Sequence, residues 1–238
     1  MKKIGFIGAY DKTDFILYLA KIIVEFGRSV LFVDATITQK ARYIVPNIQT
    51  SKSYITTFEG IDVAVGMKNI DEIKQYLNIP EQNDMPYDFV LIDTNSAGGV
   101  ASYRINECEK IYFTTSMDLY SIRKGIESLK IFPTQIEVSK ILFSKKAEKE
   151  EVDYLNFLSN GSNIAWKKLE NGKEDIIYLP FEIGDETVIY KNQRVSKIRL
   201  RGFSSQYKEG LMYVTSQILE ESDYKTLAKV FRKVEKGV

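Results

Sequence analysis

The chain has 238 residues, of which 44% are hydrophobic and 27% charged, so it holds enough apolar side chains for a sizeable buried core. Its 33 Lys and Arg residues balance 32 Asp and Glu residues, which leaves no overall field toward nucleic acid or anionic lipid. One cysteine and no histidine exclude an intrachain disulfide, a histidine-based triad and a structural zinc site. No apolar run of about 18 residues and no signal peptide are evident, so we expect a cytoplasmic protein.

Three continuous apolar runs predict strands buried on both faces, at residues 4–7, 30–33 and 89–92. Between the first two, apolar residues recur at helical spacing from Phe15 to Phe26, and Gly27 is suited to end that helix. A strand, a helix and a second strand within about 30 residues indicate a right-handed βαβ unit.

The same alternation continues along the chain. Further strands are expected at 61–65, 109–115, 139–144 and 175–181, and further helices at 70–78, 121–132, 146–161 and 208–219. This order predicts an α/β fold, a three-layer, doubly wound, mostly parallel sheet flanked by helices, as a single domain over residues 1–221. A basic amphipathic helix is expected at 222–238. Such sheets bind ligands at the carboxyl ends of their strands, so the loops after Ile7, Val33 and Ile92 form the candidate site.

Those loops carry the most specific patterns in the sequence. Residues 7–14 read IGAYDKTD between the first strand and the first helix, VLFVDAT ends a strand on Asp34, and YDFVLIDTNS ends one on Asp93. In this order the chain resembles the MinD/ParA group of P-loop ATPases (the deviant Walker A, or SIMIBI, class), whose loop reads K-G-G-x-G-K-[ST]-[ST]. The stretches EKIYFTTSMDLYSIRKG and DIIYLPFEIGDETVIYKNQ are similar to later segments of the same family.

The resemblance implies a P-loop nucleotide-binding fold and assigns candidate residues. ATP or ADP with Mg²⁺ would be the cofactor, and Thr13 and Asp93 would lie on the side of the metal. Asp34 and Asp93 would be the catalytic carboxylates if the chain is active. Members of the family form homodimers, so the resemblance also implies a homodimer. The residues expected to face the phosphates are Gly8, Ala9, Tyr10, Asp11, Lys12, Thr13 and Asp14, and those expected beside the adenine are Pro180, Phe181 and Glu182.

The loop departs from the family's pattern at several positions. Asp11 replaces the glycine before the lysine, Ala9 replaces another glycine, Ile7 replaces the signature lysine, and Thr36 replaces the second acid of the D-x-D motif. Like charges at about 4 Å repel by about 4 kcal/mol at an effective dielectric of 20, so a carboxylate at Asp11 opposes a polyphosphate. Because phosphoryl transfer depends on positioning and charge stabilisation, we predict a degenerate loop and a pseudo-ATPase without catalytic turnover.

The predicted function is therefore a non-hydrolysing scaffold or positioning protein that localises or assembles partner proteins at a pole, a membrane apparatus or a partitioning plasmid or chromosome. The alternative is an active or nucleotide-gated ATPase that dimerises on Mg-ATP. Individual residues also keep two interpretations. Lys12 and Thr13 either contact phosphate or begin the first helix, Asp11 either faces the phosphates or caps that helix, and Asp34 and Asp93 either serve chemistry or accept structural hydrogen bonds.

Two basic segments support a third hypothesis, binding to a DNA or membrane surface. One carries Lys191, Arg194, Lys197, Arg199 and Arg201, and the C-terminal helix carries Lys229, Phe231, Arg232 and Lys233. The competing interpretation is that the first segment is a solvated edge and that the last helix docks on its own domain or on a partner. A peripheral location at the membrane or the cell pole would follow from surface binding.

Overall fold

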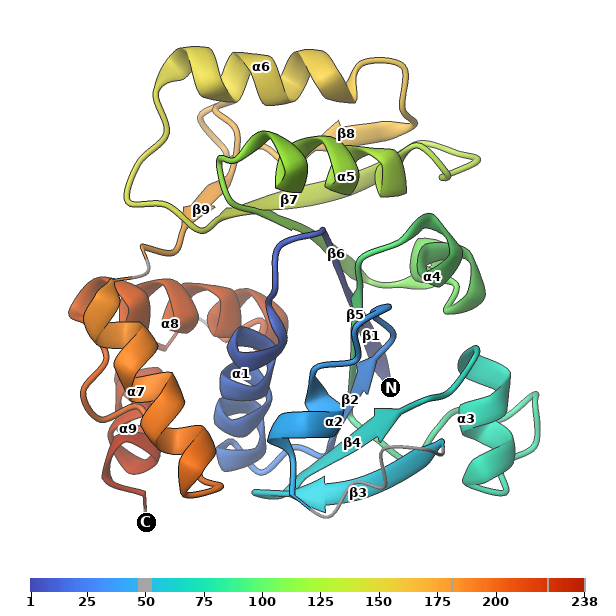
Figure 1. Cartoon of the computed structure of the whole chain (residues 1–238), viewed down its shortest axis with the longest axis vertical. Helices are drawn as coiled ribbons and strands as arrows, with labels where there is room; N and C mark the ends of the chain where they lie inside the picture. Colours follow the sequence, from blue (N-terminus) through green and yellow to red (C-terminus); the bar gives the residue numbers. More distant parts are fainter. Residues whose placement is uncertain (47–52, 181, 222, 238) are drawn as a thin grey trace.

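The computed structural model describes residues 1–46, 53–180, 182–221 and 223–237. Within them a nine-stranded sheet forms the centre of the molecule, in the order β3-β4-β2-β5-β1-β6-β7-β8, with β9 also pairing β7 (Figure 1). All pairs are parallel except β3 with β4. The strands are β1 (Lys2–Ile7), β2 (Val30–Asp34), β3 (Tyr54–Phe58), β4 (Ile61–Val65), β5 (Phe89–Thr94), β6 (Lys110–Thr115), β7 (Ile136–Leu142), β8 (Ile164–Trp166) and β9 (Ile176–Tyr178).

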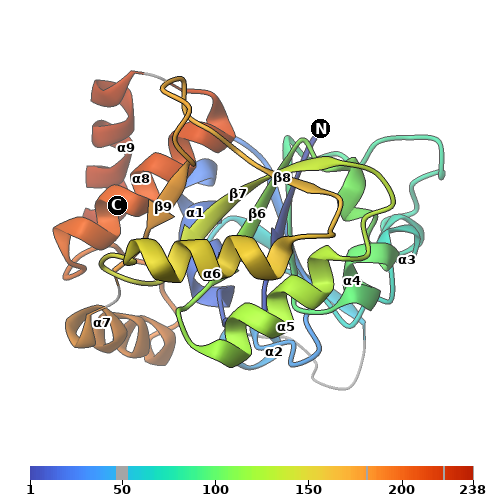
Figure 2. The same cartoon turned by 90° about the horizontal axis from the view of Figure 1, so that it is seen from above.

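Helices cover both faces of this sheet. The helices are α1 (Thr13–Glu25), α2 (Ala41–Ile44), α3 (Ile70–Tyr76), α4 (Ala97–Ser102), α5 (Leu119–Leu129), α6 (Lys149–Ser159), α7 (Ile183–Arg194), α8 (Ser205–Leu219) and α9 (Tyr224–Lys236), with a 3₁₀ turn η1 (Ile105–Glu107). One core unites α1, α7, α8 and α9 with the sheet, and the other unites α3, α4, α5 and α6 with its opposite face. In the view from above, α7, α8 and α9 lie at one side of the molecule and α3 and α4 at the other (Figure 2). The predicted three-layer, mostly parallel α/β fold is confirmed.

The antiparallel hairpin of β3 and β4 was not expected from the sequence. Glu59 and Gly60 connect the two strands, and both have left-handed backbone angles, with φ of 53° and 83°. Two successive left-handed residues match the twist of a tight hairpin. A glutamate rarely occupies such a position, so the turn carries no familiar sequence signal.

The segment after β9 also differs from the expected strand at 175–181. The strand ends at Tyr178, and α7 begins at Ile183 behind a capping box. In this box the Glu182 backbone N–H donates to the Asp185 carboxylate at 3.0 Å. The reciprocal caps satisfy backbone donors that a helix start leaves free, which explains why a helix forms where the sequence showed no apolar stripe.

The last helix, α9, packs on α1 and α8. Its side chains Leu227, Phe231 and Val234 are buried, and Lys233 reaches Glu25 of α1 at 2.6 Å. Phe231 therefore lies in the core and is not one of the surface-binding residues, because the apolar face of the helix is covered by its own domain. No helix within the described ranges has the length and apolar character needed to cross a membrane.

A buried lysine stabilises the far side of the sheet. The side chain of Lys140 on β7 is 1% exposed, donates to Asn156 of α6 at 2.6 Å and pairs with Glu174. Its ammonium also lies 4.3 Å from the centre of the Trp166 ring. Burial lowers the pKa of Lys140, and the Glu174 carboxylate opposes that shift. This cluster joins β7, α6 and β8.

Candidate functional site

The loop at residues 8–12 leaves β1 at the carboxyl edge of the sheet and enters α1. Glycine is required at Gly8, because a Cβ there would lie 1.9 Å from the Thr114 carbonyl oxygen. The Gly8 N–H donates to the Thr94 carbonyl oxygen at 3.1 Å. Gly8 is thus held between the ends of β5 and β6, and a larger residue would displace the loop from the sheet.

The side chain of Lys12 is turned into the protein and is 1% exposed. Its Nζ lies 2.6 Å from Asp93 Oδ1 and donates to the carbonyl oxygens of Gly8 at 2.9 Å and Thr94 at 3.3 Å. An ammonium has three N–H donors, and three oxygens of the chain surround this one. Removing one partner of a buried ion pair costs about 3–5 kcal/mol, so these contacts hold the loop against β5.

Asp93, at the end of β5, is fully buried. Lys12 approaches Oδ1 at ion-pair distance but off the direction of a hydrogen bond, and Oδ2 has no hydrogen-bond partner among the described residues. Burial raises the pKa of Asp93 to about 7; the Lys12 ammonium opposes this shift, and the neighbouring Asp34 carboxylate adds to it. Among the described carboxylates of the site, Asp93 is the one that has an oxygen without a hydrogen-bond partner. That oxygen can therefore take a further ligand.

Asp11 and Lys40 form a bridge across the mouth of the loop. Asp11 Oδ1 accepts the Thr13 backbone N–H at 3.1 Å, and Lys40 donates to Asp11 Oδ2 at 2.7 Å and to Asp14 Oδ2 at 2.5 Å. Asp14 Oδ1 in turn accepts from Gln193 of α7 at 2.8 Å. Burial raises the pKa of Asp11, but the Lys40 ammonium and the Thr13 N–H outweigh it, so the pKa lies below its ordinary value. Asp11 takes the first N–H of α1, as the capping interpretation expects, although Lys12 occupies the N-cap position itself.

Asp34, at the end of β2, organises the segment that carries Lys40. Its Oδ1 accepts from the Thr36 N–H at 3.1 Å and from the Thr36 hydroxyl at 2.6 Å, and its Oδ2 accepts the Ala41 N–H at 2.9 Å. Burial raises the pKa of Asp34, which these three donors oppose. Asp34 therefore has a structural role here: it closes the turn after β2 and positions Lys40 toward the loop.

Two cavities flank the Asp11–Lys40 bridge. A cavity of about 440 Å³ is lined by the loop and by the strand ends, and a second of about 230 Å³ lies toward α7. Both are lined by Tyr10, Asp11 and Lys40, so these three side chains stand between them. The larger is lined by Ala9, Tyr10, Asp11, Lys12, Thr13, Thr36, Thr38, Lys40, Tyr43, Asp93, Asn95 and Tyr120. In the smaller, the Tyr10 ring packs on Phe143 with centroids 4.5 Å apart.

Thr13 and Asp93 fit a role as ligands for Mg²⁺. Both line the larger cavity, both present oxygen, and the free Asp93 Oδ2 suits a hard cation. Within the described ranges no three His, Cys, Asp or Glu side chains are grouped to hold a metal. A magnesium ion would therefore need phosphate or water oxygens as its other ligands, and when bound it would supply positive charge to those phosphates.

The residues expected beside an adenine lie elsewhere. Pro180 lines a separate cavity between β9 and α8, together with Tyr178 and Tyr213. Phe181 lies outside the described residues. Glu182 caps α7 and pairs with Lys145 at 2.8 Å, so its side chain serves the helix start. The side chains that α7 presents to the loop are Glu186, Ile189 and Tyr190.

The two basic segments are exposed, as a surface role requires. Those side chains are Lys191, Arg194, Lys197, Arg199 and Arg201 in the first segment, and Lys229, Arg232 and Lys233 in α9. Lys197 forms an ion pair with Glu59, with 3.0 Å between Nζ and Oε1. Neither segment contributes a side chain to the cavities around the loop.

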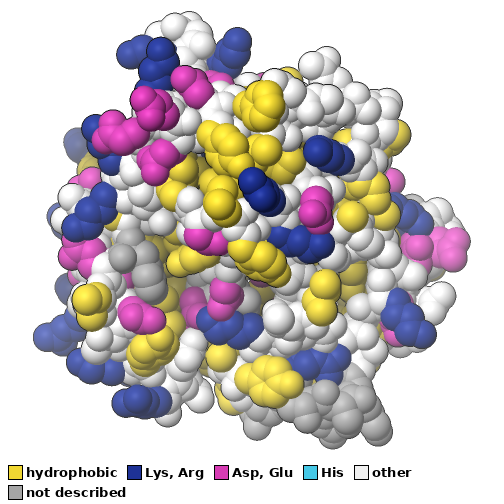
Figure 3. All heavy atoms as spheres, turned by 45° about the horizontal axis from the view of Figure 1, so that its top comes forward, with side chains coloured by type: hydrophobic (Ala, Val, Ile, Leu, Met, Phe, Trp, Pro, Cys, Tyr) yellow, Lys and Arg dark blue, Asp and Glu magenta, His cyan; other side chains and the backbone are white. Residues whose placement is uncertain are grey.

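Large apolar side chains are exposed at the same edge of the sheet as the loop. Ile37 and Tyr43, which follow β2, are 77% and 75% exposed, and Leu119 and Tyr120, which begin α5, are 56% and 70% exposed. Tyr43 and Tyr120 line the larger cavity. The space-filling view shows hydrophobic side chains in several clusters on one face, with acidic and basic side chains between them (Figure 3). Exposed apolar side chains gathered at one edge are typical of surfaces that contact other molecules.

Sequence reasoning missed several residues of the site, namely Thr38, Lys40, Tyr43, Asn95 and Tyr120, and two of them make bonds that organise the loops. Lys40 is separated from Asp11 by 29 positions, and the only available signal was that it is the single basic residue in the loop after β2. Asn95 accepts the Ile37 N–H at 2.9 Å and thereby ties the loop after β5 to the loop after β2. Both act through long-range contacts that no local pattern encodes.

Comparison with known proteins assigns the fold. Neither a scan of protein-family profiles nor a search of curated proteins finds a match to the sequence. A chain of the MinC:MinD cell division protein complex of Aquifex aeolicus is 13% identical, with a TM-score of 0.59 over 93% of this chain and 97% of that chain. A ParA family ATPase of Chlorobium tepidum TLS is 13% identical, with a TM-score of 0.57 over 90% and 98%. Apo McdA of Cyanthece is 12% identical, with a TM-score of 0.53 over 99% and 98%. The chain thus has the fold of the MinD/ParA-like P-loop ATPases.

Proposed function

We propose that the chain is a non-hydrolysing protein of this fold that positions or assembles partner proteins. The observation that carries the proposal is the internal bonding of the loop. The Lys12 ammonium is buried against Asp93 and two carbonyl oxygens, and the Thr13 N–H is taken by the Asp11 carboxylate. Groups that a P-loop uses for phosphate are therefore already bonded within the chain.

The strength of these contacts differs. The Asp11 side chain is 53% exposed and that of Lys40 is 33% exposed, so their ion pair contributes at most about 1 kcal/mol. Lys12 and Asp93 are both buried, and separating them leaves an uncompensated charge. Asp11 acts mainly through its charge, since a nucleotide phosphate would meet a carboxylate at the entrance to α1.

Side chains that act on phosphate in this family are also absent at two positions outside the loop. Thr36 stands at the family's second acidic position, and its hydroxyl donates to Asp34, which is satisfied by backbone and side-chain donors. Neither residue is then free to orient a water molecule. Ile7 stands at the position of the signature lysine and is buried in the core. These features favour a loop that has a structural role rather than a catalytic one.

Nucleotide binding provides the first test. Full-length protein is heated with and without Mg-ATP, and phosphate release is measured beside a Lys12→Ala variant. A ligand present at about 100 times its Kd would stabilise the fold by about 2.7 kcal/mol, which raises the melting temperature by several degrees in a chain of this size. We expect no shift and no phosphate release above that of Lys12→Ala. A saturable shift together with Lys12-dependent release would refute the proposal.

The role of Asp11 is tested by restoring glycine. We expect Asp11→Gly to gain measurable Mg-ATP binding, because the change removes the carboxylate and frees the Thr13 N–H. The same change combined with Lys12→Ala is the control, and there the gain should vanish. If Asp11→Gly binds no better than the parent chain, Asp11 does not close the loop.

The positioning role is tested at the apolar edge. A photoreactive phenylalanine analogue placed at Tyr120 should crosslink a partner in the cells that make the protein. Tyr76 on α3, which is 45% exposed, is the matched control position. Crosslinks at Tyr120 but not at Tyr76 support a partner at the loop edge, and equal or absent crosslinking at both argues against it.

One observation favours a second candidate, a nucleotide-gated protein that dimerises on Mg-ATP. Lys12, Thr13 and Asp93 line one cavity, and Asp93 Oδ2, which has no hydrogen-bond partner among the described residues, could accept a cation. The thermal shift separates the candidates, and light scattering with and without Mg-ATP reports any change from monomer to dimer.

A further inference from the structure

A groove runs between the edge of the sheet at β9 and helix α8. It has a volume of about 430 Å³ and shares no lining residue with the two cavities around the loop. Its helical wall consists of Gln206, Glu209, Gly210 and Tyr213, which recur at i, i+3, i+4 and i+7 and so lie on one face of α8. The helix is a neighbour of β9 in both views of the chain (Figure 1, Figure 2). We call this space, between Ile176–Tyr178 and those four residues, the β9–α8 groove.

The strand wall of the groove presents unpaired backbone groups. β9 pairs with β7 on one side, and no described strand pairs with its other side. The Leu179 N–H donates to the Leu142 carbonyl oxygen at 2.8 Å, and in a parallel pair alternate residues turn toward the neighbouring strand. The N–H and C=O groups of Ile176 and Tyr178 therefore point away from β7, and none of them has a hydrogen-bond partner among the described residues. Such an edge is a template for a further extended chain.

Part of this edge is covered by α8. A Cβ built on Gly210 would lie 3.2 Å from the Tyr178 carbonyl oxygen, so the helix lies against that carbonyl. The groups left to a peptide are the Ile176 N–H and C=O and the Tyr178 N–H, on two residues that are half-buried in the groove wall. β9 itself contains neither a charged residue nor a proline, which are the usual protection of an edge strand.

One carboxylate of the groove has no partner. Lys145, at one end, pairs with Glu182 at 2.8 Å. Asp175 is buried and accepts a hydrogen bond from the Tyr213 hydroxyl at 3.2 Å. Glu209 is exposed, and within the described residues neither an ion pair nor a hydrogen bond engages its side chain. Tyr213 follows Glu209 by one helical turn and is 42% exposed, so a carboxylate and an aromatic ring stand side by side.

We propose that the β9–α8 groove binds an extended, arginine-containing peptide segment of a partner protein. The backbone of the peptide pairs with Ile176, as a strand added to the edge of the sheet. A guanidinium forms a bidentate pair with a carboxylate and stacks on an aromatic ring, and Glu209 and Tyr213 supply these two groups. Leu169 and Pro180 offer apolar contact to a neighbouring side chain of the peptide. This assignment rests on the proposed positioning function, because it gives the chemistry of a partner, but not on the state of the nucleotide loop.

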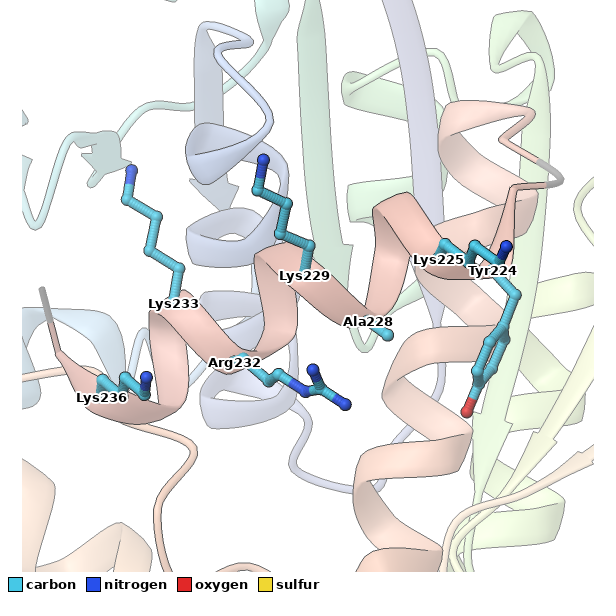
Figure 4. Close-up of a pocket in the computed structure, with 7 residues that line it drawn as sticks. All are labelled: Tyr224, Lys225, Ala228, Lys229, Arg232, Lys233 and Lys236. Carbon is cyan, nitrogen blue, oxygen red and sulfur yellow. The ribbon is translucent and has the colours of Figure 1, made fainter.

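A second groove, along α9, does not offer the same groups. Its lining residues all belong to α9, and their basic side chains project from that helix (Figure 4). Because an α-helix satisfies its own backbone groups, this groove offers side chains alone, and its positive charge repels an arginine. An arginine-containing peptide therefore distinguishes the two grooves.

Phage-displayed random heptapeptides, selected on the immobilised full-length protein, supply the probe. We expect the enriched sequences to contain arginine beside apolar or β-branched residues, and a fluorescein-labelled copy of one sequence measures affinity by anisotropy. Glu209→Gln should weaken its binding about tenfold, because a charge-assisted pair is lost. Replacing the arginine of the peptide by citrulline should cost the same factor, and the two changes together should cost no more than either one. Glu81→Gln removes an exposed carboxylate after α3 and should leave the affinity unchanged.

The pairing of the peptide with β9 has a test of its own. Successive N–H groups of an extended chain point to opposite sides. Methylating the peptide nitrogens one at a time should therefore weaken binding at alternate positions and spare the positions between them. Equal losses at all positions would show that the peptide is not added to the strand.

Four further results would overturn the proposal. They are the absence of enriched peptides, enrichment of sequences without arginine, equal losses in Glu209→Gln and Glu81→Gln, and self-association of the free protein that Glu209→Gln disperses. The last result would make a second copy of the chain the occupant. Phosphate release and Mg-ATP binding test the proposed function without involving Glu209, so the two proposals can fail independently. Circular dichroism and thermal melting confirm that each variant is folded.

Discussion

Raising the pH from about 5 to about 8 should destabilise this protein through Asp93. Burial raises the pKa of this carboxyl from 3.8 to about 7 in the folded chain. An unfolded chain releases the proton at the lower pKa, so between the two values the folded state binds more protons and the free energy of unfolding falls as pH rises. The slope is about 1.4 kcal/mol per pH unit until the folded pKa is passed, which amounts to about 2–3 kcal/mol over this interval.

The composition of the chain makes this pH dependence of the free energy of unfolding measurable. The chain has no histidine, so no imidazole titrates between pH 5 and pH 8. Urea unfolding followed by circular dichroism at closely spaced pH values gives the free energy at each pH. Asp93→Asn should remove most of the decline between pH 5 and pH 8, whatever its effect on absolute stability through the loss of the Lys12 ion pair, and the raised pKa of Asp34 contributes the remainder.

The control is Asp118→Asn. Hydrogen bonds from Ser116 and Ser121 hold the pKa of Asp118 at about 2, so its stabilising contribution is lost only as pH falls through the acid range. That variant should therefore keep the decline of the parent protein. A parent curve that is flat or rises from pH 5 to pH 8, or an Asp93→Asn curve that falls as steeply as that of the parent protein, would refute the burial argument for this carboxyl.

Three further substitutions test the packing around the site. Gly8→Ala should destabilise the chain by more than about 3 kcal/mol in urea unfolding, because its Cβ meets a backbone carbonyl, whereas Gly98→Ala, which meets open space in α4, should be neutral or stabilise by up to about 1 kcal/mol. Phe231→Ala should cost about 3–5 kcal/mol if α9 shares the core of the domain, and a cost below about 1 kcal/mol would show a detached helix. Lys140→Met should cost about 1–3 kcal/mol in urea unfolding, because Glu174 loses its buried partner; no measurable cost would contradict the ion-pair role.

The layers of the fold could be predicted because each depends on a local pattern. Continuous apolar runs placed β1, β2 and β5, and the strand at 61–65 was placed at the bounds that β4 has in the structure. The sheet order and the hairpin of β3 depend instead on contacts between distant segments. The turn at Glu59 adopts a left-handed angle that glutamate rarely takes, and α7 begins at a capping box rather than at an apolar stripe.

The position of the site could be predicted from the sequence, but its hydrogen bonds and ion pairs could not. The order of motifs placed Asp11, Lys12 and Asp93 at one edge of the sheet, where the structure has them. The partners of these residues could not be deduced, because Lys40 approaches from the loop after β2 and its position depends on Asp34.

The bonding of Lys12 and Asp93 explains how a P-loop motif can persist without its reaction. Once a lysine is buried in this loop, its ammonium needs an anion, and once Asp93 is buried at the end of β5, its carboxylate needs a cation. Each residue satisfies the other at 2.6 Å, and replacing either one leaves a buried charge unpaired. Each residue therefore has a structural role in the fold besides any role in nucleotide chemistry. The residues that bear on nucleotide chemistry are those without such a structural need: Asp11, whose side chain is half exposed, and Asp93 Oδ2, which lacks a partner in the described chain.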